Sequence, residues 1–212
     1  MKNLKPRADK LAQYYQARYD GGLVPLASEL SVYLTDLMKG ELRIDRVSVR
    51  AKAPVSFLNK AALEVGGTPK YVDPLAQIQD QIGARIITFY KSDVDRIDAL
   101  IHQYFKTIEF KDRVPESEWE FGYFGRHYVL VVPTDVKIAS IDQAHIPDFF
   151  ELQIKTLFQH AWSEAEHDLG YKPNSAPLSG DEKRKLAYTS AQAWGADQMF
   201  DELFRSRNIN TP

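Results

Sequence analysis

Hydrophobic residues recur at helical spacing near both ends of the chain and alternate with polar residues through its middle. The helical spacing predicts six helices, over residues 8–20, 24–38, 54–64, 93–105, 155–168 and 181–206. Alternation or a short apolar run predicts five strands, over residues 44–49, 82–89, 107–111, 127–132 and 149–154. We expect turns or loops at Gly21-Gly22, at 66–69, at 112–125 and at 173–180, where glycine and proline gather.

The order of these elements predicts an α+β fold, because strands and helices do not alternate regularly. A chain of 212 residues with 44% hydrophobic content can bury one substantial core, so we expect a single domain over residues 1–212. Within it we expect N-terminal helices over 1–40, a catalytic core over 41–172 and a C-terminal helix over 181–206.

Composition narrows the classes of protein. The formal net charge of -2 gives no global basic field for nucleic acid or an acidic membrane, so any polyanion must bind to a local basic patch. The absence of cysteine excludes disulfides, thiolate metal sites and a cysteine nucleophile. Neither a signal-peptide run nor a membrane-spanning stretch occurs, so we expect a cytoplasmic protein with no membrane partner.

Alternate positions in the predicted strand at 149–154 and directly after it carry an acid, an amide and a base, in Glu151, Gln153 and Lys155, so that the three share one face. A solvated strand face is the commoner explanation of such a pattern taken alone. Here the strand opens the run F-E-L-Q-I-K-T-L-F-Q-H-A-W-S-E-A-E-H-D-L-G-Y-K, which ends in a helix dense with functional groups.

This run resembles the synthetase domain of the RelA/SpoT alarmone family, in its E-L-Q-I-K-T and H-A-W-S-E-A-E-H blocks and a following tyrosine. Three further blocks resemble that family and come in its order, at residues 47–60, 80–87 and 122–128. The chain therefore looks like a stand-alone small alarmone synthetase. The resemblance implies a mixed β-sheet of the nucleotidyltransferase type flanked by helices, with both substrates in a cleft across it.

The resemblance also implies an activity, namely transfer of pyrophosphate from ATP to the ribose 3′-hydroxyl of GDP or GTP with release of AMP. Such a transfer needs a divalent cation and positive charge on the phosphates. Asp80 precedes one strand and Glu151 lies in another, so neighbouring strands could bring both carboxylates to one Mg²⁺. By resemblance Asp80 is the metal ligand and Glu151 the catalytic residue, which could also accept the proton of the hydroxyl.

Basic residues for the ATP triphosphate come from one strand and the helix after it. Arg50 and Lys52 share a strand face, and Ser56 and Lys60 are one helical turn apart, so the four can converge. Arg85 can point into the same cleft, and the resemblance assigns it to ATP, where it could stack on adenine.

The acceptor residues are assigned by resemblance. Tyr123 would stack on the guanine base with His127 nearby, while Gln153 and Lys155 would face the nucleotide phosphates. Lys155 stands where the family more often has arginine, so this contact loses the bidentate fork.

The acceptor block departs from the family pattern. The family usually has a basic residue shortly before Gly-Tyr and reads G-Y-R-S-x-H, whereas this chain has E-S-E-W-E-F followed by G-Y-F-G-R-H. Arg126 could replace one missing phosphate contact. If it does not, the acceptor could differ, as in toxic relatives that act on the tRNA 3′ end or on adenosine nucleotides.

A non-catalytic nucleotide-binding regulator is a further alternative, but such a module has no need of both Asp80 and Glu151. The spacing of His160, Glu164 and His167 could also suggest zinc, yet catalytic zinc helices usually carry H-E-x-x-H. We therefore favour the synthetase interpretation. A homo-oligomer and an antitoxin partner are left open.

Overall fold

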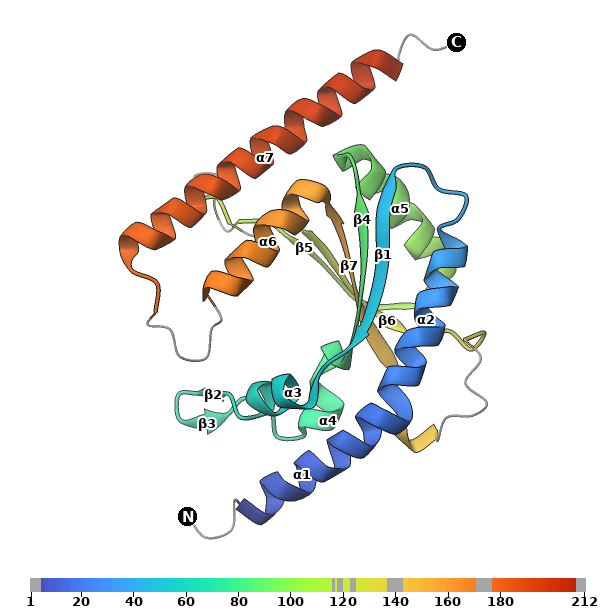
Figure 1. Cartoon of the computed structure of the whole chain (residues 1–212), viewed down its shortest axis with the longest axis vertical. Coiled ribbons are helices and arrows are strands. Elements are labelled where there is room, and N and C mark those ends of the chain that lie inside the picture. The colour runs from blue at the N-terminus through green and yellow to red at the C-terminus, as the bar shows by residue number, and fades with distance from the viewer. Residues whose placement is uncertain are drawn as a thin grey trace.

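A five-stranded mixed β-sheet forms the centre of the computed structural model, which describes residues 5–115, 117, 120–122, 125–136, 143–170 and 177–208 (Figure 1). In sheet order the strands are β1 (Ile44–Ala51), β4 (Ile82–Thr88), β7 (Phe149–Thr156), β6 (Gly125–Val131) and β5 (Thr107–Arg113). The central pair β4–β7 is parallel, and the three other pairs are antiparallel. This confirms the predicted mixed sheet and all five expected strands.

Helices surround the sheet. In chain order they are α1 (Lys5–Arg18), α2 (Val24–Leu37), α3 (Pro54–Ala61), α4 (Pro74–Gln77), α5 (Lys91–Tyr104), α6 (Leu157–Gly170) and α7 (Gly180–Asn208). Short 3-10 turns lie at η2 (Gln79–Gln81) and η3 (Gln143–His145). Helices α6 and α7 pack together at one end of the sheet, away from α1 and α3 (Figure 1). Within the described residues, none of the helices is both long and apolar enough to cross a membrane.

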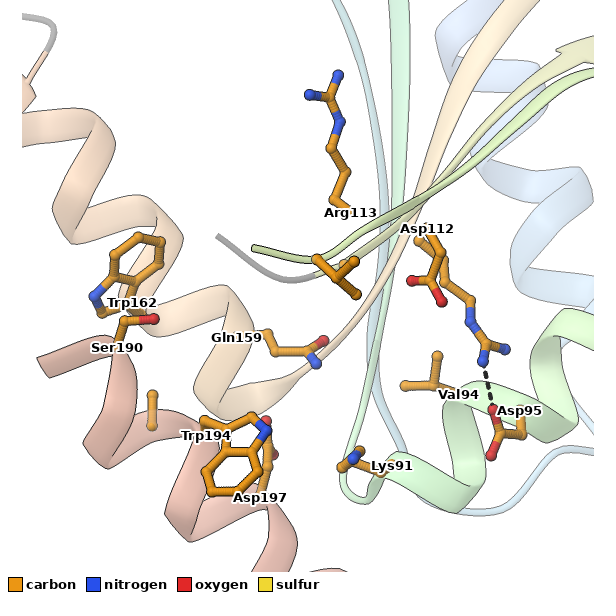
Figure 2. A pocket seen from close by; sticks show the side chains of 14 residues that line it. Lys91, Val94, Asp95, Asp112, Arg113, Gln159, Trp162, Ser190, Trp194 and Asp197 are labelled. Carbon is orange, nitrogen blue, oxygen red and sulfur yellow. Dashed lines mark hydrogen bonds and ion pairs between the residues drawn. The ribbon is translucent and has the colours of Figure 1, made fainter. Parts of the chain in front are cut away.

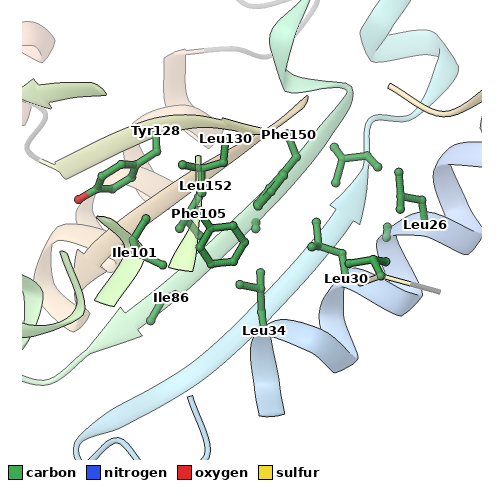
Figure 3. Packing of buried hydrophobic residues seen from close by; sticks show 14 of the residues in the cluster. Leu26, Leu30, Leu34, Ile86, Ile101, Phe105, Tyr128, Leu130, Phe150 and Leu152 are labelled. Atoms are coloured by element: carbon green, nitrogen blue, oxygen red, sulfur yellow. The ribbon is translucent and has the colours of Figure 1, made fainter. Parts of the chain in front are cut away.

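One face of the sheet forms the hydrophobic core, because alternate residues of each strand point to the same side. Leu26, Leu30 and Leu34 of α2 and Ile101 of α5 pack on this face, where they meet strand residues that are almost completely buried (Figure 3). The strand residues are Ala84, Ile86, Tyr128, Leu130, Phe150, Leu152 and Ile154. The opposite face of the sheet is therefore available for polar side chains.

The predicted turn at Gly21-Gly22 is wrong, since the chain continues from α1 to α2 through a single π-helical turn (Tyr19–Leu23). The Val24 N–H bonds to the Tyr19 carbonyl, five residues earlier. A Cβ at Gly22 would lie 2.5 Å from the carbonyl oxygen of His145. Gly22 therefore permits a close approach between helix and backbone, and does not serve as a chain reversal.

Two predicted loops are shorter than expected. Residues 64–69 form a small hairpin of β2 (Glu64–Val65) and β3 (Thr68–Pro69), with Gly66 and Gly67 in left-handed conformations at φ 59° and 77°. In the predicted loop at 112–125, β5 extends to Arg113 and β6 begins at Gly125.

Polar contacts near the middle of helix α7 connect it to β7 and to α5. Asp197 accepts a hydrogen bond from Thr156 Oγ1 at the end of β7 (2.7 Å), and Asp201 accepts one from the Ser92 N–H at the start of α5 (2.8 Å). Asp197 is only 3% exposed, and its Oδ1 has no hydrogen-bond partner among the described residues. Burial raises the pKa of Asp197 to about 6.

The raised pKa of Asp197 predicts a pH-dependent stability. Between the unfolded pKa near 4 and the folded pKa of about 6, the folded protein binds the extra proton, so the contribution of Asp197 to stability falls as pH rises through this window. Asp197→Asn cannot titrate. The free energy of unfolding of the parent should therefore fall by about 1–3 kcal/mol relative to that of the variant when the pH rises from 4.5 to 7.5.

Chemical denaturation at both pH values measures this shift. Asp181→Asn, at an exposed position of the same helix, is the control. Parallel pH profiles for Asp197→Asn and the parent would show that Asp197 titrates normally.

Candidate active site

The polar face of the sheet gathers most of the predicted site residues. Paired residues on neighbouring strands point to the same side, and the register joins Arg50, Gly83 and Glu151 in one row. The adjacent row joins Arg85, Gln153 and His127. Lys155 lies further along β7 on the same face. The strands thus bring six predicted residues to one surface, namely Arg50, Arg85, His127, Glu151, Gln153 and Lys155.

Asp80 lies at the end of this surface, in η2 just before β4, and holds two lysines. Its Oδ2 accepts from Lys52 Nζ at 2.8 Å and its Oδ1 from Lys60 Nζ at 2.9 Å. Burial alone would raise the pKa of Asp80, but the hydrogen bonds and charges of the two lysines hold this pKa below its usual value. The cluster is therefore a carboxylate and two ammonium groups, all charged. Ser56 lies exposed on α3, one turn before Lys60.

Glu151 projects from the neighbouring strand beside open space. Its Oε1 is 2.8 Å from His127 Nδ1 and accepts a weaker hydrogen bond from Gln153 Nε2 at 3.4 Å. Burial raises its pKa, yet His127 outweighs burial and the net pKa is lowered, while the charge of Asp80 acts in the opposite sense. A Cβ built on Gly83, which pairs with Glu151, would meet no atom within 4 Å, so a ligand can approach this carboxylate closely.

Asp80 and Glu151 suit a magnesium ion that is shared with a nucleotide. The described part of the chain contains no cluster of three or more His, Asp or Glu that would hold a metal by itself. Magnesium commonly takes only one or two protein carboxylates and completes its octahedron with phosphates and water. Each Asp80 oxygen accepts from one lysine and keeps a second lone pair for an ion. The two carboxylates therefore fit such a site.

Helix α6 adds groups to which the sequence analysis assigned no part in binding either nucleotide. Glu164 accepts from Arg85 Nη1 at 2.5 Å, so the predicted ATP-side arginine is tied to α6. His160 Nδ1 and Gln153 Oε1 are buried without a hydrogen-bond partner in the described structure. Unpaired buried polar atoms at one surface are typical of a site that a ligand completes. The spacing of these helix residues was visible in the sequence, but their partners were not.

Lys155 lies on the polar face but under α6. It is 2% exposed, and its Nζ donates to Ser163 Oγ at 2.9 Å. Burial, helped by the positive charge of Arg85, lowers the pKa of Lys155 to about 7. A lysine in this environment gains or loses its charge near neutral pH.

Arg126 does not join the other predicted acceptor residues. It neighbours His127 in β6, so its side chain leaves the opposite face of the sheet, where it pairs with Asp95 (2.6 Å) and Asp98 (3.4 Å) of α5. In this structure it does not replace the missing phosphate contact. Tyr123, the predicted stacking residue, lies outside the described residues.

The lowered pKa of Lys155 predicts a pH dependence of acceptor binding. The charged ammonium attracts the acceptor phosphates from its place under α6, so the acceptor KM should rise by up to about tenfold as pH increases from 6.5 to 8.5. In Lys155→Arg the side chain stays charged, and this rise should flatten. Acceptor KM measured against pH in both proteins tests the expectation, since titration of the acceptor itself is common to both. Equal slopes would mean that Lys155 does not titrate in this range.

Comparison with known proteins gives the class of this site. Residues 49–176 match the region found in RelA / SpoT proteins, and the chain belongs to this family. The matched range includes the two carboxylates, α6 and the whole polar face except the start of β1.

Individual relatives agree with this assignment. The chain is 26% identical over 162 residues to GTP pyrophosphokinase YjbM of Bacillus subtilis (strain 168), covering 76% of this chain and 72% of that protein. The crystal structure of small alarmone synthetase 1 from Bacillus subtilis superposes with a TM-score of 0.72 at 22% identity, over 93% of this chain and 97% of that one. The same enzyme bound to its product pppGpp gives 0.68 at 23% identity, over 92% and 97%. The sheet and its helices thus have the fold of a stand-alone small alarmone synthetase.

Proposed function

We propose that the protein is an ATP-dependent pyrophosphokinase that moves the β,γ-pyrophosphoryl group of ATP to the ribose 3′-hydroxyl of GDP or GTP. AMP is the second product. The observation that carries the proposal is one polar surface, formed by the sheet face with Glu151 beside the open space at Gly83 and by Asp80 with its two lysines at the end of that face. In a member of the RelA/SpoT family this arrangement is suited to a metal-bound triphosphate.

The charged cluster at Asp80 provides the ATP site. Mg²⁺ held by Asp80 and Glu151 would neutralise negative charge on the phosphates. Lys52 and Lys60, already gathered at this point, donate to non-bridging phosphate oxygens, and the exposed Arg50 adds positive charge on the same face. Arg85 lies one row further along, where it can contact the adenosine part of ATP.

Glu151 faces the reacting hydroxyl. The 3′-hydroxyl of the acceptor gives its proton to Glu151 as its oxygen bonds to the β-phosphorus. The bond from that phosphorus to the α-phosphate oxygen breaks, and AMP leaves with the electron pair. The hydrogen bond from His127 keeps Glu151 ionised and oriented, so the carboxylate is ready to accept the proton.

The acceptor binds on the side of β6 and α6. His127 and Gln153 line this side, with the buried Lys155 next along β7 under α6. The unpartnered Gln153 Oε1 offers an acceptor to a nucleotide N–H or O–H group. Tyr123 is proposed to stack on the base. The relative named a GTP pyrophosphokinase and the fold shared with a pppGpp-bound enzyme support a guanosine acceptor.

Incubation with γ-labelled ATP and Mg²⁺ tests the proposal, with GDP, GTP, ADP and bulk tRNA supplied separately. Label should enter GDP and GTP, with AMP formed in equal amount. Label in tRNA alone or in ADP alone would show that this molecule, and not a guanosine nucleotide, is the acceptor. The absence of label and of AMP with every acceptor would refute the enzyme assignment.

The two carboxylates should be indispensable. Asp80→Asn and Glu151→Gln each remove a charge required by the metal or the proton transfer and little volume, so each should reduce kcat at least about a hundredfold. Glu29→Gln, an exposed position on α2, is the matched control. Labelled-product assays together with thermal unfolding separate catalysis from folding. A loss below about tenfold, roughly 1.4 kcal/mol of barrier, would contradict the assignment.

The aromatic ring of Tyr123 should act on the acceptor alone. Tyr123→Ala removes a stacking surface worth about 1–3 kcal/mol, so the acceptor KM should rise roughly five- to hundredfold while the ATP KM changes little. Tyr123→Phe keeps the ring and serves as the control. Equal changes in both KM values would place Tyr123 in a structural role.

A further inference from the structure

Helix α7 holds the chain segment that leads into β6. Ser190 Oγ donates a hydrogen bond to the carbonyl oxygen of Gly122 at 2.6 Å, and Ser190 is 1% exposed. One helical turn further, the ring of Trp194 meets that of Phe121 edge-on, with centroids 5.9 Å apart. Residues four apart lie on the same helix face, so both contacts come from one side of α7.

The position of this segment links it to the reacting groups. Gly122 directly precedes Tyr123 in the sequence, and β6 begins at Gly125, two residues before His127. His127 contacts Glu151. The described residues on the two sides of positions 123–124 therefore contact α7 through Phe121 and Gly122, and Glu151 through His127.

Little else in the described structure fixes Gly122. A Cβ added to this residue would find no atom within 4 Å. A pocket of about 350 Å³ separates α7 from the strand ends here, lined by Ser190 and Trp194 of α7, Trp162 and Gln159 of α6, and Gly125 of β6 (Figure 2). Within the described residues, the two side-chain contacts from α7 are what joins Phe121 and Gly122 to the rest of the fold.

We propose that Ser190 and Trp194 are positioning residues for the acceptor nucleotide. They fix Phe121 and Gly122, and through them the point from which Tyr123 reaches the acceptor base. This rests on the proposed function. The ATP-side residues lie on β1, α3 and β4, at the other edge of the sheet from β5 and β6, so α7 should set acceptor affinity and leave ATP affinity unchanged.

Steady-state kinetics of Ser190→Ala, Trp194→Ala and Trp194→Phe test the proposal, with Gln192→Ala on an exposed part of the same helix as the control. Loss of one hydrogen bond or ring contact should raise the acceptor KM about three- to tenfold, with the ATP KM within about twofold of the parent. Trp194→Phe keeps an aromatic contact and should recover most of the affinity. A merely structural role would change kcat and both KM values together, and that result would overturn the proposal.

Hydrogen exchange of the free protein gives a readout that needs no activity. Ser190→Ala should speed amide exchange in the peptide that spans residues 120–125, with the β4 and β7 peptides unchanged. Unchanged exchange at 120–125 would overturn the proposal even if the kinetics shift. If the parent labels no acceptor at all, the proposed function fails and the positioning role fails with it. An active parent with unaltered variants refutes the positioning role alone.

Discussion

The parallel pairing of β4 with β7 is the constraint on which the candidate site depends. Parallel strands cannot be joined by a tight turn, so α5, β5 and β6 intervene in the chain between the two partners. The pairing places Gly83 opposite Glu151 and brings Asp80, three residues before Gly83, to the same end of the sheet. Asp80 and Glu151 are far apart in the sequence, and it is this register that brings them to the same end of the sheet. The antiparallel strands on both sides then add Arg50 on one flank and His127 on the other.

Charge balance gives this surface its second property. Asp80 binds two lysines, while Glu151 is held by His127, so each carboxylate is kept ionised by basic neighbours. A phosphate group that enters can take over the lysines as hydrogen-bond partners, which frees the Asp80 oxygens for a cation. The ion pairs of the free protein thus already hold the charged side chains close together. Because the lysines are partly exposed, added salt weakens these pairs.

Much of the fold and of the polar face could be predicted from the sequence, for physical reasons. Strand alternation put Glu151, Gln153 and Lys155 on one face, and the order of the four motif blocks implied the mixed sheet. The same alternation excludes Arg126 from that face, although its place beside His127 in a family motif suggested a phosphate contact. The burial of Lys155 under α6 and the contact of Ser190 with Gly122 join distant segments, and no local pattern encodes them. The π-helical turn was missed because paired glycines usually mark chain reversals, whereas here Gly22 makes room for His145.

That close approach limits which mutations the N-terminal helices can tolerate. His145 belongs to η3, only a few residues before β7 begins, so the turn between α1 and α2 lies close against the backbone that leads into the strand of Glu151. Even a methyl group at position 22 would have to push this backbone aside, since its nearest contact is a carbonyl rather than the end of a flexible side chain. A substitution far in sequence from every catalytic residue could therefore shift Glu151 along the sheet. The space at position 22 thus couples the N-terminal helices to the strand of Glu151, although Gly22 itself lies far from that carboxylate in the sequence.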